Sequence, residues 1–296
     1  MTDFYKTRVK YFFDAEVESV KFNDIKGKIR KINDPARRVN RNSVTDENHI
    51  NQDLCPPMSV LSQNYFRGQF SPQVKVSSMT FSNLKQGRRL STIPSLSWSG
   101  TLNAGYDQDL DAIGVEIPYD GEDVSLIIVS PGKITKHKHE SLGKIEAQIN
   151  TKSWEQLLKS FMSRNLELEI PIFQSQSLFE LNETLIELGV SNAFSTEADF
   201  SGINGSKDLK LSSFVQSNKF SINANFKRSR GDFVQEARVR KIKRRRNKRN
   251  IEKLRYDMKF DKQFMYIVRH NPSGLLLYIG RYDPHNWVDQ QSINQR

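Results

Sequence analysis

The stretch Phe260-Asp-Lys-Gln-Phe264-Met-Tyr-Ile-Val-Arg-His270-Asn-Pro-Ser-Gly274-Leu-Leu-Leu-Tyr-Ile-Gly280-Arg281 decides the fold of this 296-residue chain. Two apolar runs in it are separated by the turn-forming set Asn-Pro-Ser-Gly. Proline presets φ in such a turn, and glycine can adopt positive φ. The stretch therefore predicts a hairpin in which residues 260–268 and 275–281 pair antiparallel within a larger sheet. The side chains expected to be buried are Phe264, Ile267, Leu276 and Tyr278.

The remaining apolar pattern predicts an α+β protein. Short apolar runs bounded by turn residues are typical of strands, and spacing of three or four residues is typical of helices. The predicted strands include most of residues 58–131, then 166–173 and 209–225. The predicted helices are 3–14, two short ones within 141–163, and 178–188, which Gly189 ends. Helices that cluster among runs of strands favour α+β over alternating βαβ units.

Several segments in chain order resemble one family, the serpins, which are serine protease inhibitors. The hairpin is similar to the closing hairpin of that family. The other matching segments are Tyr65-Phe-Arg-Gly68-Gln-Phe70, Val115-Glu-Ile-Pro-Tyr119, Val124 to Pro131, Leu178 to Leu188, Asn192-Ala-Phe194 and Ala198 to Ile203. The resemblance implies a serpin-like α+β fold of mixed sheets and clustered helices with an exposed reactive-centre loop. We expect one partial domain over 1–296, with the hinge and loop at 226–259.

The resemblance begins near residue 3, at a point where the family fold has already formed its first helices. We therefore expect either a fragment of a longer serpin domain or a true short form that has lost part of the fold; in both cases those helices are missing and apolar sheet surface is left uncovered. Large uncovered apolar surface promotes association. The chain is expected to be poorly soluble or oligomeric when it is expressed by itself.

In the family, the segment before the closing hairpin is a bait loop offered to a protease. Here it contains Arg238-Val-Arg-Lys-Ile-Lys-Arg-Arg-Arg-Asn-Lys-Arg249, in which nine of twelve residues are Lys or Arg. Repulsion between like charges favours an extended, solvated run. Such bait suits a trypsin-like or basic-pair-cutting serine protease. Counting back from the hairpin in the family manner gives the P1 candidates Arg249, Arg246 and Arg255.

The hinge before the bait is unlike that of family inhibitors, whose cleaved loop inserts as a new strand in the central sheet and traps the protease. The matching residues are Arg228, Ser229, Arg230, Gly231, Asp232 and Phe233, followed by Val234 and Gln235. Alternate side chains of an inserted strand enter a packed interior, where charge is costly. Here, neither set of alternate hinge residues consists only of small side chains. Asn218 and Ser62 also replace a histidine and its asparagine partner, and Pro35 replaces a tryptophan. We expect cleavage without trapping.

Two other interpretations of the basic run stay open. The net charge of +11 and the pI near 9.6 favour polyanionic partners. The run could hold sulfated polysaccharides such as heparin-like glycosaminoglycans, with nucleic acid the less favoured polyanion. The candidate residues are Lys241, Lys243, Arg244, Arg245, Arg246, Lys248, Arg30, Lys31, Arg37 and Arg38. Alternatively, the run is a loop without a selected role.

Other functional classes find little support in the sequence. No nucleophile, metal-ligand or phosphate-loop pattern points to an enzyme or a cofactor, so neither is predicted. No apolar run is long enough to span a bilayer. The family resemblance implies an extracellular location, which two N-glycosylation acceptors fit, Asn182 and Asn204. A single cysteine, Cys55, leaves the redox compartment undetermined.

Overall fold

The structure, a computed structural model, describes residues 1–14, 58–66, 68–70, 74–83, 89–132, 142–222 and 256–283. The chain divides into two compact units. Unit 1 comprises residues 1–67 and 174–220, and unit 2 comprises residues 68–173 and 221–296. The single domain over 1–296 stays a prediction.

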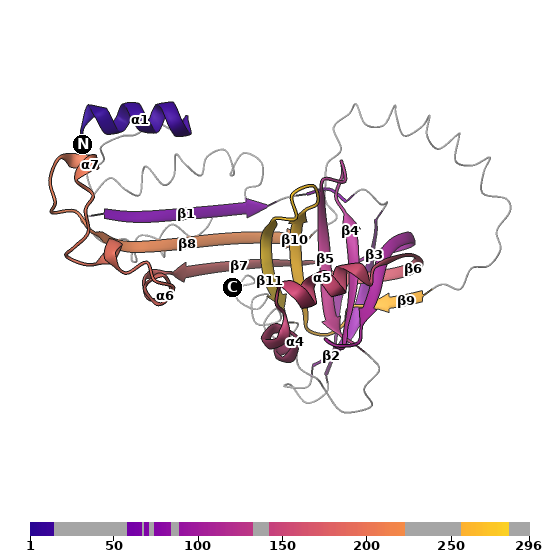
Figure 1. The fold of residues 1–296 in the computed structure, drawn as a ribbon. Helices are drawn as coiled ribbons and strands as arrows, with labels where there is room; N and C mark the ends of the chain where they lie inside the picture. Colours follow the sequence, from indigo (N-terminus) through magenta and orange to yellow (C-terminus); the bar gives the residue numbers. More distant parts are fainter. Residues whose placement is uncertain are drawn as a thin grey trace, which may run out of the picture. The chain divides into compact units, whose positions relative to one another are not determined.

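Unit 1 is built on a three-stranded sheet in the order β1-β8-β7 (Figure 1). Its strands are β1 (Met58–Phe66), β7 (Phe173–Glu180) and β8 (Leu211–Ile222). Its helices are α1 (Asp3–Phe13), α6 (Asn182–Glu187), the 3₁₀ turn η2 (Asn192–Phe194) and α7 (Ser201–Asn204). Thr2 caps α1 by accepting from the N–H of Tyr5, and its own N–H donates to the Ile203 carbonyl at 2.8 Å. This hydrogen bond holds the first residues of the chain beside α7.

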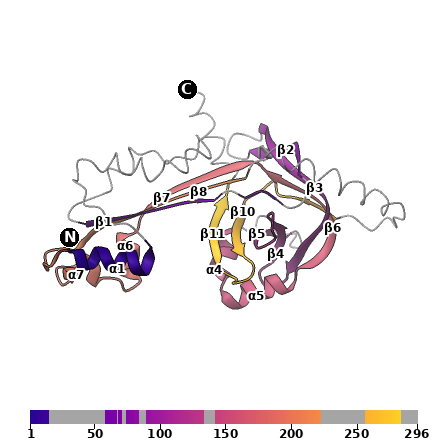
Figure 2. The same cartoon turned by 90° about the horizontal axis from the view of Figure 1, so that it is seen from above.

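Unit 2 is built on an eight-stranded sheet in the order β11-β10-β5-β4-β3-β6-β9, with β2 paired to β3 beside this path. The strands are β2 (Lys75–Asn83), β3 (Arg89–Asp107), β4 (Ala112–Pro118), β5 (Val124–Pro131), β6 (Met162–Pro171), β9 (Tyr256–Lys259), β10 (Phe264–His270) and β11 (Leu276–Tyr282). The sheet is strongly curved in Figure 2, where β3 and β6 bend along one side of it. The α+β class predicted from the sequence is confirmed.

Two helices cover one face of this sheet, α4 (Leu142–Gln148) and α5 (Thr151–Lys159). Leu142, Ile145 and Leu157 of these helices pack against apolar side chains of β4, β5 and β10. The sequence predicted both helices within 141–163. Asn150 begins α5 with a capping box, in which its side chain accepts from the N–H of Ser153 and the Ser153 hydroxyl accepts from the N–H of Asn150.

The predicted hairpin is confirmed as β10 and β11, which pair antiparallel while β10 also pairs with β5. Gly274 closes the turn at a φ of 73°, a left-handed conformation that glycine adopts without strain. Asn271 fastens the turn to the β4–β5 connection, because its side chain donates to the Glu122 carbonyl and the Ser125 hydroxyl, both at 2.8 Å. A side-chain amide at this position can donate both hydrogen bonds, which accounts for the asparagine in the turn.

The burial predicted for the hairpin is correct in β10 and wrong in part of β11. Phe264 and Ile267 are buried, as are all residues from 264 to 268. Tyr278 is half-buried, but Leu276 is 43% exposed. The two strands differ because β10 has strands on both sides and β11 ends the sheet.

The helix predicted over 178–188 is too long at its start. Residues 178–180 belong to β7, and α6 begins only at Asn182. The Leu181 N–H donates to the Phe214 carbonyl at 2.8 Å, so pairing with β8 continues up to the helix. The end of the helix was predicted correctly. Gly189 has a φ of 96°, and its N–H and that of Val190 donate to the carbonyls of Ile186 and Leu185, which is a Schellman ending.

Candidate functional site

The candidate site is the seam between β1 and β8 in unit 1. These strands are parallel neighbours, with no strand between them, and their register runs from Ser59 opposite Ser213 to Phe66 opposite Phe220. Hydrogen bonds are evenly spaced but slanted in such a ladder, and each pairing is slightly weaker than an antiparallel one. None of the residues of β1 is fully buried. The seam is therefore a weakly covered junction between two long strands.

Polar side chains bridge the seam on one face of the sheet. The Asn64 amide donates to the Asn218 side-chain oxygen at 2.9 Å, and the Asn218 amide donates to the Ser177 hydroxyl at 3.4 Å. These three residues lie on β1, β8 and β7, so the bonds cross the whole three-stranded sheet. A second bridge lies on the opposite face and joins Ser213 to Ser59, whose hydroxyl oxygens are 2.7 Å apart.

The other face of β8 buries polar groups as well. Ser213, Ser217 and Lys219 are buried at every second position of the strand, which is the period of one sheet face. Burial lowers the pKa of the Lys219 ammonium, because removal from water disfavours the charged form. Polar and charged groups in this strand reduce the apolar burial that holds the sheet together.

The end of β8 is where the predicted hinge and bait loop begin. β8 ends at Ile222 in the three-stranded sheet, and β9 begins at Tyr256 in the eight-stranded sheet. All the predicted hinge, P1 and polyanion-binding residues lie outside the described residues. These are Arg228, Ser229, Arg230, Gly231, Asp232, Phe233, Arg249, Arg246, Arg255, Lys241, Lys243, Arg244, Arg245, Lys248, Arg30, Lys31, Arg37 and Arg38. They stay predictions.

The structure places a different residue opposite Asn218 than the family positions would suggest. The family position of the partner is Ser62, but in the register of the two strands Ser62 lies opposite Gln216, and Asn64 lies opposite Asn218. The sequence contained a signal for this, because Asn64 has the same parity as Ser62 and carries the side chain that a hydrogen bond to an amide requires. The register of two parallel strands depends on contacts between segments that are distant in the sequence. The sequence therefore did not reveal whether Ser62 or Asn64 lies opposite Asn218.

The two predicted glycosylation residues differ in their surroundings. The side chain of Asn182 donates to the Ser212 carbonyl at 3.0 Å and accepts from the Phe214 N–H at 2.8 Å, so both ends of its amide are used within unit 1. The Asn204 amide is also used at both ends, since it donates to Asp208 at 3.1 Å and accepts from the Ser206 N–H at 2.9 Å, but these bonds are exposed whereas those of Asn182 are partly buried. Glycosylation of either residue stays a prediction.

The described part of the chain contains no group of three or more side chains arranged to hold a metal ion. Among the same residues, no helix is both long and apolar enough to cross a bilayer.

Comparison with known proteins identifies the family to which the chain belongs. The profile described as "Serpin (serine protease inhibitor)" matches residues 1–284. The chain belongs to the serpin family. Family members are protease inhibitors rather than enzymes; that this serpin is not an enzyme stays a prediction.

Curated relatives of this serpin are similar over most of its length. Serpin B10 from Bos taurus is 26% identical over 286 residues, which are 94% of this chain and 68% of the relative. Leukocyte elastase inhibitor from Homo sapiens is 26% identical over 236 residues, 78% of this chain and 59% of the relative. Intracellular coagulation inhibitor 2 from Tachypleus tridentatus is 26% identical over 255 residues, 84% of this chain and 58% of the relative. The chain thus spans about three-fifths to two-thirds of these relatives.

Solved structures show the same fold. Native protease nexin-1, crystallised with heparin, superposes with a TM-score of 0.71 at 21% identity and covers 94% of this chain and 71% of the other. Maspin superposes with a TM-score of 0.68 at 19% identity over the same shares of the two chains. The serpin-like α+β fold is therefore confirmed.

The extracellular location that the family resemblance implied is wrong. The matched relatives are serpin B10, leukocyte elastase inhibitors and a protein named as an intracellular coagulation inhibitor. The resemblance had been identified at the level of the whole family, and location differs among its members.

Proposed function

We propose that this serpin offers a bait loop with a basic P1 residue, within 226–259, to a trypsin-like or basic-pair-cutting serine protease. The observation that carries the proposal is the seam, in which β8 runs directly beside β1 and leads into the loop segment. In the family mechanism, the cleaved loop enters the central sheet as a new strand. Direct parallel pairing of β1 with β8 supports such a site of entry.

Opening the seam requires the loss of its backbone ladder and of both side-chain bridges. A new strand between β1 and β8 would restore backbone hydrogen bonds on both of its sides, so the ladder is exchanged rather than lost. The bridges are not restored, because Asn64 and Asn218 would move apart. Each such hydrogen bond contributes about 0.5–1.5 kcal/mol to stability, so the seam itself is a modest barrier.

The hinge is the larger obstacle. One parity of the predicted hinge presents Arg228, Arg230 and Asp232. The other presents Phe233 and Gln235 after two small residues. The buried face of β8 already contains a lysine, and burying a further charge beside it is unfavourable. Each ~1.4 kcal/mol added to the insertion barrier slows insertion about tenfold, while deacylation of the protease continues. We therefore propose that cleavage outpaces trapping.

The test is incubation of the full chain with trypsin, followed by denaturing gel electrophoresis and mass spectrometry of the products. We expect cleavage between Arg238 and Arg255 and no covalent one-to-one complex. A variant with alanine at residues 231–236 should form some complex if the hinge is the obstacle. A matched control with alanine at residues 206–207, which are exposed in unit 1, should behave like the parent. A stable complex of the parent chain would contradict the proposal of turnover, and resistance to cleavage would contradict the bait loop.

A second candidate function is polyanion binding through the basic segments. The net charge of +11 supports it, as does the similarity in fold to protease nexin-1, which was crystallised with heparin. Neutralised phosphates or sulfates release counterions, so binding should weaken steeply with salt. The test is elution from immobilised heparin, comparing the parent with a variant that replaces Lys241, Lys243, Arg244, Arg245, Arg246 and Lys248 by glutamine. Elution of both at the same salt concentration would rule out this segment as the heparin site.

A further inference from the structure

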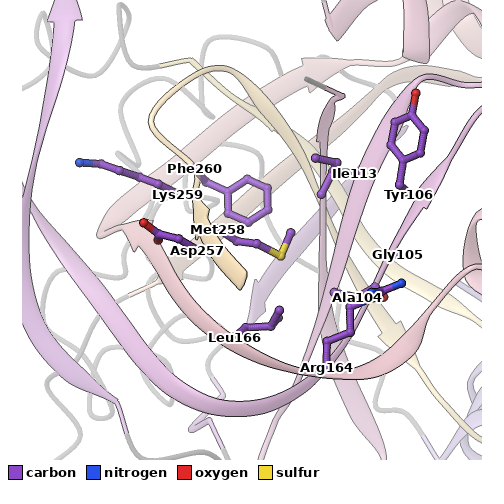
Figure 3. A pocket seen from close by; sticks show the side chains of 10 residues that line it. All are labelled: Ala104, Gly105, Tyr106, Ile113, Arg164, Leu166, Asp257, Met258, Lys259 and Phe260. Atoms are coloured by element: carbon purple, nitrogen blue, oxygen red, sulfur yellow. Dashed lines mark hydrogen bonds between the residues drawn. The ribbon is translucent and has the colours of Figure 1, made fainter. Parts of the chain in front are cut away.

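Unit 2 contains a half-open cavity of about 300 Å³ lined by residues of β3, β4, β6 and β9 and by the residue after β9 (Figure 3). Its walls are mainly apolar. They include Ala104, Ile113, Leu166, Met258 and Phe260. The size is at the lower end of the ~300–1,000 Å³ typical of small-molecule sites, which indicates a small or slender ligand.

The charged side chains at this cavity are not equally placed. The guanidinium of Arg164 is held at the wall, because its Nε donates to the Ala104 carbonyl at 3.1 Å. Asp257 and Lys259 extend away from the apolar side chains in Figure 3. Lys259 also lies 3.8 Å from a carboxylate oxygen of Glu169. Arg164 is thus the charged group that is fixed against the apolar walls.

We propose that this cavity binds a medium-chain fatty carboxylate. The alkyl chain would contact Met258, Phe260 and Leu166, and the carboxylate would lie at the Arg164 guanidinium. A guanidinium presents its N–H donors in a planar fork that matches the two oxygens of a carboxylate. Burial of the alkyl chain among apolar walls provides most of the binding free energy, and the charged end sets the orientation. This site is in unit 2 and does not depend on the proposed inhibitory function.

The bound ligand should also stabilise the pairing of β9 with β6. Met258 and Phe260 lie on β9 or directly after it, and β9 pairs with β6 over only the four residues Tyr256 to Lys259. A ligand that contacts both strands opposes their separation. Amide hydrogen exchange of residues 256–260 should therefore slow when the ligand is bound, while exchange in α5 on the other face should not change.

The experiment is isothermal titration calorimetry of the full chain with decanoate, below its micellar concentration. We expect saturable binding of one decanoate per chain. Arg164→Met should weaken binding about tenfold or more, as expected for loss of a charge-assisted pair of hydrogen bonds, and Arg164→Lys should retain part of the affinity. The matched control is Lys152→Met on α5, which removes the same charge elsewhere in unit 2 and should leave affinity unchanged.

Two further arms make the proposal falsifiable. Ala104→Leu places a larger side chain in the cavity and should abolish binding; Ile113→Phe serves the same purpose if the first variant does not fold, as judged by circular dichroism. Decanol and decylammonium should bind more weakly than decanoate. Absence of saturable decanoate binding, binding that survives the filled cavity, or equal binding of decanol would each overturn the proposal.

Discussion

β10 in unit 2 and β1 in unit 1 each contain five apolar or aromatic residues, but the two strands lie in very different surroundings. In β10 every residue from Phe264 to Val268 is buried, on both faces, and strands pair with both of its edges. In β1 no residue is fully buried, and Val60 is 38% exposed. β10 is joined to its neighbours mainly by apolar contacts, including stacked rings of Phe264 and Tyr282. β1 is joined to β8 by two polar bridges and, at its end, by the stacked rings of Phe66 and Phe220.

The difference suggests separate roles for the two regions. A strand buried on both faces is costly to remove, because its apolar side chains would return to water. A strand that is half-exposed and bridged by amides and hydroxyls can be separated from its neighbour at much lower cost. The hairpin serves as fixed scaffold, and the seam is the part of the sheet that can open.

The largest effect is expected for Ile267→Ala in β10. Removing a buried side chain of this size lowers the free energy of unfolding by about 2–5 kcal/mol, since a cavity remains. The matched change in β1, Val60→Ala, should cost less than about 1 kcal/mol because the side chain is already partly in water. Urea denaturation of both variants measures the difference. Equal losses would contradict the contrast between the two strands.

A smaller effect is expected for Gly280→Ala in β11. A methyl group at this position would overlap the ring of Tyr266 on β10. Overpacking of this kind costs about 1–3 kcal/mol. Gly202 in α7 of unit 1 is the control, because a methyl group there meets no atom within 4 Å. Gly202→Ala should leave the thermal midpoint nearly unchanged. If both variants melted like the parent, the hairpin would be looser than its packing indicates.

The third test uses Tyr282, the last residue of β11 in the hairpin. Burial and the neighbouring Asp283 carboxylate raise the pKa of Tyr282, and its buried hydroxyl has no hydrogen-bond partner among the residues that the structure describes. A raised folded-state pKa contributes stability that is fully present below the unfolded pKa, about 10, and is lost as pH rises beyond it. Tyr282→Phe should remove this loss, about 1.4 kcal/mol per pH unit above 10, and be nearly neutral at pH 7.

Urea denaturation between pH 7 and pH 11 measures this effect relative to the parent. Tyr11→Phe is the control, because Tyr11 is 81% exposed on α1 and should not change the pH dependence. The same slope above pH 10 in the parent and in Tyr282→Phe would show that the hydroxyl is hydrated.

The smallest effect is expected at the seam. A double-mutant cycle of Asn64→Ala and Asn218→Ala should give a coupling free energy of about 0.5–1.5 kcal/mol, the usual value of one hydrogen bond. The companion cycle of Ser62→Ala and Asn218→Ala should be additive, because Ser62 lies opposite Gln216. Coupling in the second cycle and not in the first would restore the family pairing and shift the register of β1.

The sequence predicted the parts of this serpin that depend on local chemistry. Residues 264–279 consist of two apolar runs separated by a turn that only certain residues form. The hairpin can therefore be predicted from the sequence of this segment alone. Gly189 ended a helix for the same reason, since glycine readily adopts positive φ. The sequence did not predict where that helix starts, because pairing of β7 with β8 extends to Glu180. Nor did it predict that Leu276 is exposed, because burial depends on whether a strand has neighbours.

The candidate site was predicted only in outline. The resemblance to the family pointed to the segment of β8, the loop after it and the position of Asn218, but it did not indicate which residue of this chain lies opposite Asn218. Which residue of β1 faces it depends on the register of two strands that are about 150 residues apart, as the separation of 154 between Asn64 and Asn218 shows. The cavity lined by Arg164 and Phe260 likewise joins distant segments. Turns and apolar periods are properties of neighbouring residues, and the sequence alone determined them; register, edge exposure and cavities are properties of packing between distant segments, and only the tertiary structure decided them.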